Sequence, residues 1–187
     1  MKILGLDSSG IVASVAIVED ENLIAEYTVN YKKTHSQTLL PMLDELVKMT
    51  ELDLDTIDAI AVAAGPGSFT GLRIGSATAK GLGLALKKPL VEIPTVDALA
   101  YNLYDSRALI CPIMDARRSQ VYTGIYRFQE HKLVTVEAQM AVPMAEMIEK
   151  LNARGEEVVF LGDGVPVFGK MIQENLKVPY SFAPAHV

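Results

Sequence analysis

Two aspartates stand where predicted strands end, and their carboxylates could bind a hydrated magnesium ion. Asp7 follows the apolar run 3–6, and Asp115 follows the apolar run 109–114. At matching strand ends of two lobes, the carboxylates could face each other across a cleft and supply the oxygen ligands that magnesium prefers. The alternative is that each aspartate caps its own turn, as aspartates often do. A nucleotide bound with the magnesium ion would need the backbone to approach its phosphates. The segment after Asp115 contains no glycine that would allow this, which weakens the case for nucleotide binding.

A glycine-rich segment lies between a predicted strand and a predicted helix, where backbone N–H groups and the helix dipole can bind an anion. It reads Gly65-Pro66-Gly67-Ser68-Phe69-Thr70-Gly71. It is not a Walker sequence, because Leu72 rather than lysine follows Gly71. A tight turn with Ser68 or Thr70 as helix N-cap is the alternative, and physical chemistry alone favours that turn. If a nucleotide or another anion does bind, we expect its contacts to be Asp7, Ser8, Gly67, Ser68 and Asp115.

The remaining reactive residue types give no support for a metal site or a nucleophile. The histidines at 35, 131 and 186 lie far apart in the sequence and lack the i, i+4 spacing of a local metal site. Ser8 and Ser9 are not part of a G-x-S-x-G elbow. Cys111 is the single cysteine, so an internal disulfide is impossible, as expected in the cytoplasm. We therefore predict no metal and a cytoplasmic protein.

Composition and charge limit the classes of partner. Half of the 187 residues are hydrophobic and 21% are charged, which indicates a globular fold. The apolar run near the N-terminus is too short for a signal peptide, and residues 71–86 contain Arg73 and Lys80 and are too few for a membrane span. The formal net charge of −6 repels RNA, so RNA binding would need a local basic patch or a basic partner. The basic residues in turns are Lys32, Lys33, Arg117 and Arg118.

The predicted elements occur twice in the same order. The first set has strands over 2–7, 12–18 and 23–31, a helix over 36–50, a strand over 57–64 and a helix over 68–86. The second set has strands over 108–115, 120–128 and 133–138, a helix over 143–153, a strand over 157–161 and a helix over 168–176. Asp7 and Asp115 lie 108 positions apart, and the turns at Glu19 and Gln129 lie 110 apart. We predict an α/β fold with a duplicated βββαβα unit, forming lobes 1–100 and 101–187.

Both helices of the first lobe have unusual surfaces. In the first, the apolar residues, among them Leu39, Met42, Leu43 and Leu46, fill an arc of about 180°, whereas a core stripe needs about 100°. In the second, Gly71, Gly75, Ala79 and Gly83 form one ridge of small residues, which indicates close packing of another backbone. The ridge could pack inside its own lobe or against another subunit, and the wide arc could be core with room for a partner along one edge. Sequence alone leaves these alternatives open.

The motifs resemble those of the bacterial TsaB (YeaZ) family. The matching segments are Ile3-Leu4-Gly5-Leu6-Asp7-Ser8-Ser9, His35-Ser36-Gln37, Gly65 to Gly75, Ala79-Lys80-Gly81 and Ile113-Met114-Asp115-Ala116-Arg117. The resemblance implies the actin-like ATPase (ASKHA) fold, with two similar lobes. It also implies a second lobe that is incomplete here, because family members continue with further C-terminal structure.

The resemblance implies a non-catalytic scaffold subunit that supports threonylcarbamoyl transfer to the adenosine next to the anticodon of tRNA. Its implied partners are the catalytic paralogue TsaD and the ATPase TsaE, with a homodimer when alone and tRNA reached only through the complex. ATP and magnesium would then belong to the complex. Where the catalytic relatives carry paired metal-binding histidines, residues 92–99 contain none.

The family pairs through its first two helices, which implies a set of interface residues for this chain. These are Leu39, Met42, Leu43, Leu46, Gly71, Arg73, Gly75, Ala79 and Gly83. One alternative is an ATP-dependent enzyme with a nucleotide site between the lobes. Another is a peptidase, because the group was formerly called glycoprotease-like. No nucleophile and base can be named for the peptidase.

Overall fold

The computed structural model describes residues 1–31 and 35–184, so Lys32 and Lys33 lie outside the described residues, as do positions 185–187. The chain divides into two compact units, Met1–Thr95 and Val96–Val187. The division expected after residue 100 lies earlier, because Val96 and Ala100 are fully buried in a core cluster of the second unit. None of the helices in the described ranges is long and apolar enough to cross a membrane.

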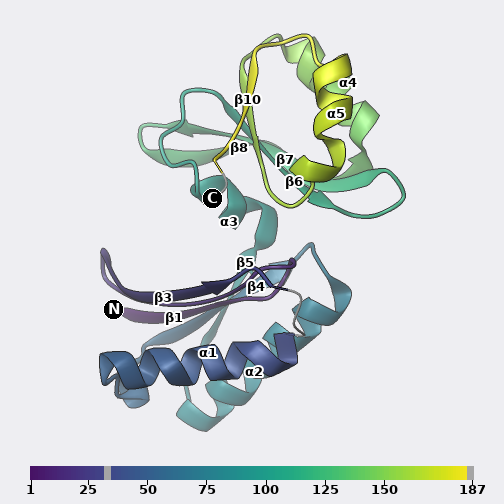
Figure 1. Ribbon diagram of the computed structural model, residues 1–187. Helices are drawn as coiled ribbons and strands as arrows, with labels where there is room; N and C mark the ends of the chain where they lie inside the picture. Colours follow the sequence, from purple (N-terminus) through teal and green to yellow (C-terminus); the bar gives the residue numbers. More distant parts are fainter. Residues whose placement is uncertain (32–34, 185–187) are drawn as a thin grey trace. The chain divides into compact units, whose positions relative to one another are not determined.

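The first unit is a five-stranded sheet with two long helices on one of its faces (Figure 1). The strand order is β3-β2-β1-β4-β5. Strands β1 and β2 are antiparallel, whereas β4 is parallel to β1 and β5 is parallel to β4. The elements are β1 (Lys2–Asp7), β2 (Ala13–Glu19), β3 (Asn22–Val29), α1 (His35–Thr50), the 3₁₀ turn η1 (Leu54–Thr56), β4 (Ala59–Gly65), α2 (Phe69–Leu86) and β5 (Leu90–Pro94).

The core of the first unit lies between this sheet and the two helices. Strand residues such as Leu4, Val15 and Ile17 are fully buried there, because alternate side chains of a strand point to the same face. Helix α1 supplies Leu39 and its apolar neighbours, and α2 supplies Ala79. Helix α1 continues through Pro41, as expected. Burial of this apolar surface is the main source of the stability of the unit.

The second unit repeats the strand pattern of the first. Its sheet order is β10-β9-β6-β7-β8, which read from the other edge is the order of the first sheet with corresponding strands. Strands β9 and β10 are again parallel additions beside the antiparallel β6–β7 pair. The elements are α3 (Thr95–Tyr101), β6 (Leu109–Asp115), β7 (Gln120–Gln129), β8 (Lys132–Pro143), α4 (Met144–Arg154), β9 (Val158–Leu161), α5 (Val165–Asn175) and β10 (Tyr180–Phe182).

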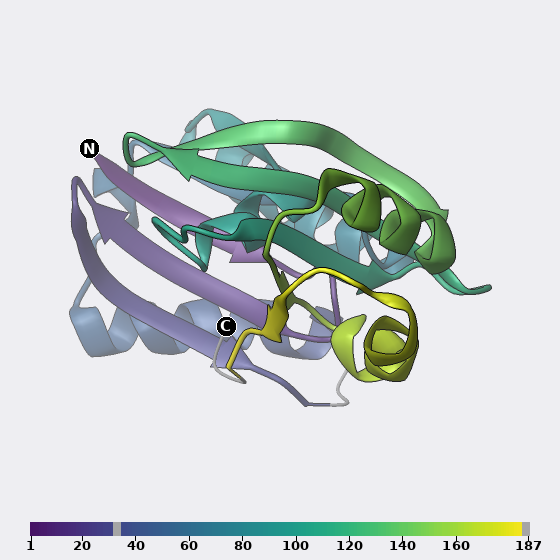
Figure 2. The same cartoon turned by 90° about the horizontal axis from the view of Figure 1, so that it is seen from above.

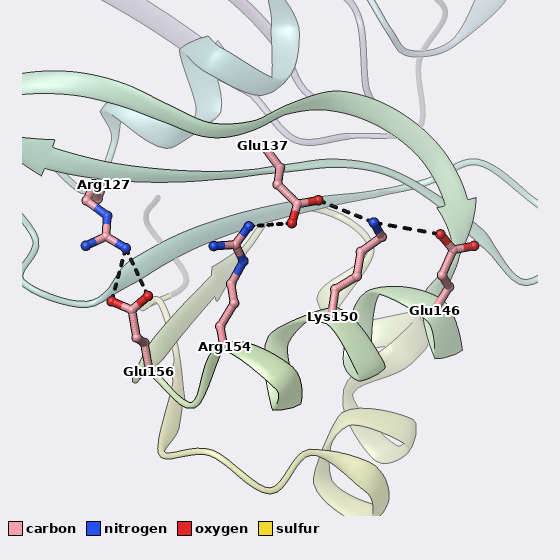
Figure 3. A network of polar contacts seen from close by, with 6 residues as sticks. All are labelled: Arg127, Glu137, Glu146, Lys150, Arg154 and Glu156. Carbon is pink, nitrogen blue, oxygen red and sulfur yellow. Dashed lines mark hydrogen bonds and ion pairs between the residues drawn. The ribbon is translucent and has the colours of Figure 1, made fainter.

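The duplication predicted from the sequence is therefore confirmed, and the repeated unit contains one strand more than expected. Figure 2 shows the long β7–β8 hairpin of the second unit in green, with α4 beside it. Ion pairs connect β8 to α4: Glu137 contacts Lys150 and Arg154, and Lys150 also lies near Glu146 (Figure 3). This small network ties the helix to the strand at the surface of the unit.

Candidate functional site

Three loops of the first unit meet at the end of β1. The turn after β1 packs against the segment between β4 and α2, and both lie beside the first residue of α1. The Asp7 carboxylate accepts the Ser9 N–H at 2.7 Å, which closes a tight turn. The Nε2 atom of His35 lies 2.8 Å from the Gly10 carbonyl oxygen and carries the proton of that hydrogen bond. The turn is thus held from its first residue to its last.

The serines of this turn are buried against the start of α2. The Ser8 hydroxyl donates to the Gly71 carbonyl at 2.9 Å, and the Ser9 carbonyl accepts the Ser68 N–H at 2.6 Å. Ser68 is the N-cap of α2, and its hydroxyl oxygen accepts the Gly71 N–H at 3.3 Å. Of the two N-cap candidates from the sequence, Ser68 and Thr70, the structure has Ser68 in this role.

The glycines of the segment leave room only for the serine turn. A Cβ atom built on Gly67 would lie 2.4 Å from the Ser9 carbonyl oxygen, and one on Gly71 would lie 2.0 Å from the Ser8 carbonyl oxygen. On Gly75 it would lie 2.6 Å from the Ser8 hydroxyl oxygen. The ridge of small residues therefore packs inside its own lobe, which was one of the two alternatives.

The space directly above Gly67 and Gly71 is not open to a nucleotide phosphate, the group that an actin-like ATPase fold would be expected to bind. A phosphate cradle needs backbone N–H groups that point into open space at a helix N-terminus. Here the N–H groups of Ser68, Gly71 and Leu72 already donate within the chain. The backbone of the serine turn occupies the space directly above Gly67 and Gly71.

The equivalent position of the second unit is the turn between β6 and β7. The Asp115 carboxylate accepts the Arg117 N–H at 2.9 Å, and one of its oxygens lies 3.3 Å from Nη1 of Arg117. The Asp115 N–H in turn donates to the Asp163 carboxylate at 3.1 Å. Burial raises the pKa of the Asp163 carboxyl group above its ordinary value. Asp7 and Asp115 belong to different units, and each caps its own turn.

Eight of the nine residues predicted for the partner interface are buried inside the first unit. Leu39, Met42, Leu43 and Leu46 face the sheet, and Gly71, Gly75, Ala79 and Gly83 face the serine turn, the sheet or β5. Only Arg73 is exposed, with its guanidinium carbon 3.9 Å from the centroid of the Phe69 ring. A partner that reaches these two helices therefore has to contact Arg73 or residues outside the predicted set.

The outward faces of the same helices carry large apolar side chains that the sequence analysis did not single out. The exposed fractions are 51% for Leu40, 76% for Met49, 69% for Phe69 and 83% for Leu84. Leu40 and Met49 lie at the two edges of the wide apolar arc of α1, so its width beyond a core stripe was the available signal. A cavity of about 520 Å³ beside α2 is lined by Phe69 and Arg73, among others.

The comparisons with known proteins agree with this architecture. A family model described as "TsaD: tRNA N6-adenosine threonylcarbamoyltransferase" matches residues 22–185. The "tRNA threonylcarbamoyladenosine biosynthesis protein TsaB" of Bacillus subtilis (strain 168) is 36% identical over 176 residues, which cover 94% of this chain and 77% of the relative. This chain belongs to the TsaB family. The solved structure of YeaZ from Pseudomonas aeruginosa matches it with a TM-score of 0.83 at 26% identity, over 100% of this chain and 84% of that one.

A more distantly related solved structure has the same fold as this chain. The ethanolamine utilization protein EutJ from Carboxydothermus hydrogenoformans matches with a TM-score of 0.56 at 12% identity, over 100% of this chain and 85% of that one. At this identity the likeness shows the fold alone. Together with YeaZ and the repeated sheet order, it confirms the predicted actin-like ATPase fold.

In this TsaB family member, no group of three or more His, Cys, Asp or Glu residues among positions 1–31 and 35–184 could hold a metal ion.

Proposed function

We propose that this chain takes part in tRNA threonylcarbamoyladenosine biosynthesis as a non-catalytic scaffold subunit. The names of its TsaB relatives support the process. The hydrogen bonds of Asp7, Ser8, Ser68 and Asp115 support the scaffold role, because these polar groups hold turns together. In this proposal the chain works in the cytoplasm, and tRNA, ATP, magnesium and a TsaE-like ATPase meet it only in the assembled complex.

The partner we propose is a TsaD-like catalytic paralogue, bound through the outward faces of α1 and α2. The observation that carries this step is the exposure of Leu40 and Met49 on α1 and of Phe69 and Leu84 on α2, two helices that lie side by side (Figure 1). Large apolar side chains that are exposed on two adjacent helices are candidates for contact with a partner. The same face would form the homodimer of the isolated chain.

An exposed glycine on α2 adds to this support. A Cβ atom at Gly81 would meet no atom within 4 Å, so nothing inside the unit requires glycine there. Glycine inside a helix costs about 0.5–1 kcal/mol relative to alanine. Close approach of a partner helix would explain why this cost is retained, since small residues let two helix backbones come near each other.

Light scattering after size exclusion tests the proposed interface. We expect a homodimer alone and a one-to-one heterodimer with the TsaD-like partner, and we expect the double variant Leu40→Glu/Leu84→Glu to prevent both. Leu23→Glu is the matched control, because Leu23 is 59% exposed and lies on β3 rather than on either helix. A double variant that still pairs like the wild type would contradict the interface.

An activity measurement tests the scaffold role itself. Formation of threonylcarbamoyladenosine by the TsaD-like partner and the other components should require this chain. Full activity in its absence would overturn the proposal. Calorimetry with magnesium and ATP separates it from the alternative of an ATP-dependent enzyme, since we expect no heat of binding from the isolated chain.

A further inference from the structure

The turn between β6 and β7 has a costly backbone conformation. Arg117, Arg118 and Ser119 follow one another with φ angles of 67°, 52° and 60°. Residues other than glycine, asparagine and aspartate rarely adopt this left-handed conformation, and three in succession are rarer still. Two arginines at such positions gain nothing for the turn, which glycine or asparagine would form at lower cost. Strain of this kind points to a function of the side chains.

The turn is held rigidly on both sides. The Ala116 N–H donates to the Gln120 carbonyl, and the Gln120 N–H donates to the Arg117 carbonyl, both at 3.0 Å. The N–H of Met144, the first residue of α4, donates to the Ser119 carbonyl at 3.1 Å. Beneath the turn, Asp163 accepts the Asp115 N–H. The two arginine side chains therefore start from a fixed base, which lowers the entropy lost when they bind a ligand.

The two guanidinium groups are directed to solvent. The Arg117 side chain is 86% exposed although it pairs with Asp115, so most of its five N–H donors remain accessible. Arg118 is exposed, and within the described part of the chain it makes no ion pair. Adjacent guanidinium groups match the geometry of phosphate oxygens. Because Asp115 offsets one of the two charges, Arg118 is the stronger anion contact.

We propose that the β6–β7 turn contacts the phosphate backbone of tRNA, with Arg118 as the main contact and Arg117, oriented by Asp115, as the second. This inference rests on the proposed function, which supplies a tRNA substrate. The formal net charge of −6 repels RNA from most of the surface, so contact has to be local, and two arginines at the tip of one turn provide it.

The test is the salt dependence of tRNA binding by the complex of this chain with its TsaD-like partner. For the variant Arg117→Gln/Arg118→Gln we expect about tenfold weaker binding and a slope of log K against log salt that is smaller by about 1.5, because two phosphate contacts are lost. Arg107→Gln is the matched control, since Arg107 is an exposed arginine in the turn before β6. It should bind tRNA like the wild type.

Each other outcome has a defined meaning. If the double variant binds tRNA with the affinity and slope of the wild type while the wild-type complex is active, the inference is overturned and the proposed function stands. If the wild-type complex binds no tRNA, both fail. If the double variant loses the TsaD-like partner in light scattering, the turn contacts protein and the inference is overturned. Excess inorganic phosphate at constant ionic strength should weaken tRNA binding by the wild-type complex more than by the double variant, because it competes for the same guanidinium groups, and an equal effect on both would overturn the inference.

A second variant separates loss of contact from loss of folding. Arg118→Gly removes the charge but suits the left-handed conformation. We expect it to weaken tRNA binding severalfold, with a melting temperature at or above that of the wild type. Normal tRNA binding by this variant would overturn the role of Arg118.

Discussion

Gly71 and Gly81 lie on the same helix but meet opposite surroundings. A Cβ atom at position 71 would collide with the Ser8 carbonyl oxygen, whereas one at position 81 would meet open space. We expect Gly71→Ala to lower the free energy of unfolding by about 2–3 kcal/mol, because backbone has to move. Gly81→Ala should raise it by about 0.5–1 kcal/mol. Urea unfolding of the two variants measures the difference, and equal stabilities would contradict the packing described.

The strained turn makes a separate prediction about stability. Arg118 has a φ angle of 52°, so Arg118→Gly should raise the free energy of unfolding by about 1 kcal/mol. Arg107, which does not share this conformation, is the control, because Arg107→Gly should lower stability through the greater freedom of the unfolded chain. Thermal unfolding of both variants is the measurement. A loss of stability in Arg118→Gly would show that the arginine side chain itself stabilises the turn.

For single residues, the sequence predicted the capping of turns and helices better than it predicted which side chains are exposed. Ser68 as N-cap and Asp115 as turn cap follow from side-chain chemistry that acts within three residues, and both are confirmed. Asp163 as the partner of Asp115 was not predicted, because their contact spans 48 positions and Asp163 lies between the strand predicted over 157–161 and the helix predicted over 168–176. The burial of Leu39 and the exposure of Leu40 depend on which side of α1 meets the sheet.

At the scale of elements, the ion pairs between β8 and α4 predict sensitivity to acid. The hydrogen bond from Arg154, helped by Lys150, lowers the pKa of the Glu137 carboxyl group below its ordinary value (Figure 3). A carboxyl group whose pKa is lower in the folded state stabilises the fold at pH values above its ordinary pKa. This stabilisation is lost as the pH falls through the lower pKa of the folded state.

We therefore expect Glu137→Gln to lower the free energy of unfolding by about 0.5–1 kcal/mol at neutral pH. The difference from the wild type should shrink below the ordinary carboxyl pKa and vanish below the lowered folded-state pKa of Glu137. Glu149→Gln on the adjoining helix α4 is the control, because Glu149 is exposed and makes no ion pair with any residue that the structure describes. Urea unfolding across the pH range measures both. A difference that persists undiminished in acid would contradict the role of the charge.

The elements that the sequence missed are those with weak patterns. β5 and β10 have five and three residues, and they join their sheets only through parallel pairing with β4 and β9. Such short segments are specified by long-range contacts rather than by their own periodicity. The strand predicted over 133–138 extends to Pro143, because it pairs with the full length of β7. The long amphipathic helices were predicted well, since their apolar spacing recurs over many residues.

At the scale of the whole chain, each core cluster belongs to a single unit. The cluster around α1 and α2 contains residues from 4 to 82, and the other two clusters begin at residues 109 and 96. We expect the fragment 1–95 to fold on its own and to unfold cooperatively, because it keeps its sheet, its helices and the hydrogen bond from the Gly65 N–H to the Thr95 hydroxyl. Circular dichroism during urea unfolding is the measurement, and a gradual transition would contradict an independent core.

The duplicated order was visible in the sequence because strand ends and turns recur at a nearly constant offset. The boundary between the two units was not visible in the sequence. It depends on whether the short helix α3 belongs to the first or the second unit, and this is decided by the core that covers Val96 and Ala100.

The fit between the serine turn and the glycines of α2 also constrains how this lobe can change over time. The Ser8 and Ser9 carbonyls lie where any side chain at Gly67 or Gly71 would have to be. A side chain at position 67 or 71 is therefore acceptable only if the backbone of the serine turn moves. We expect glycine at positions 67 and 71 in every relative whose chain keeps this path, whichever residues stand at positions 8 and 9.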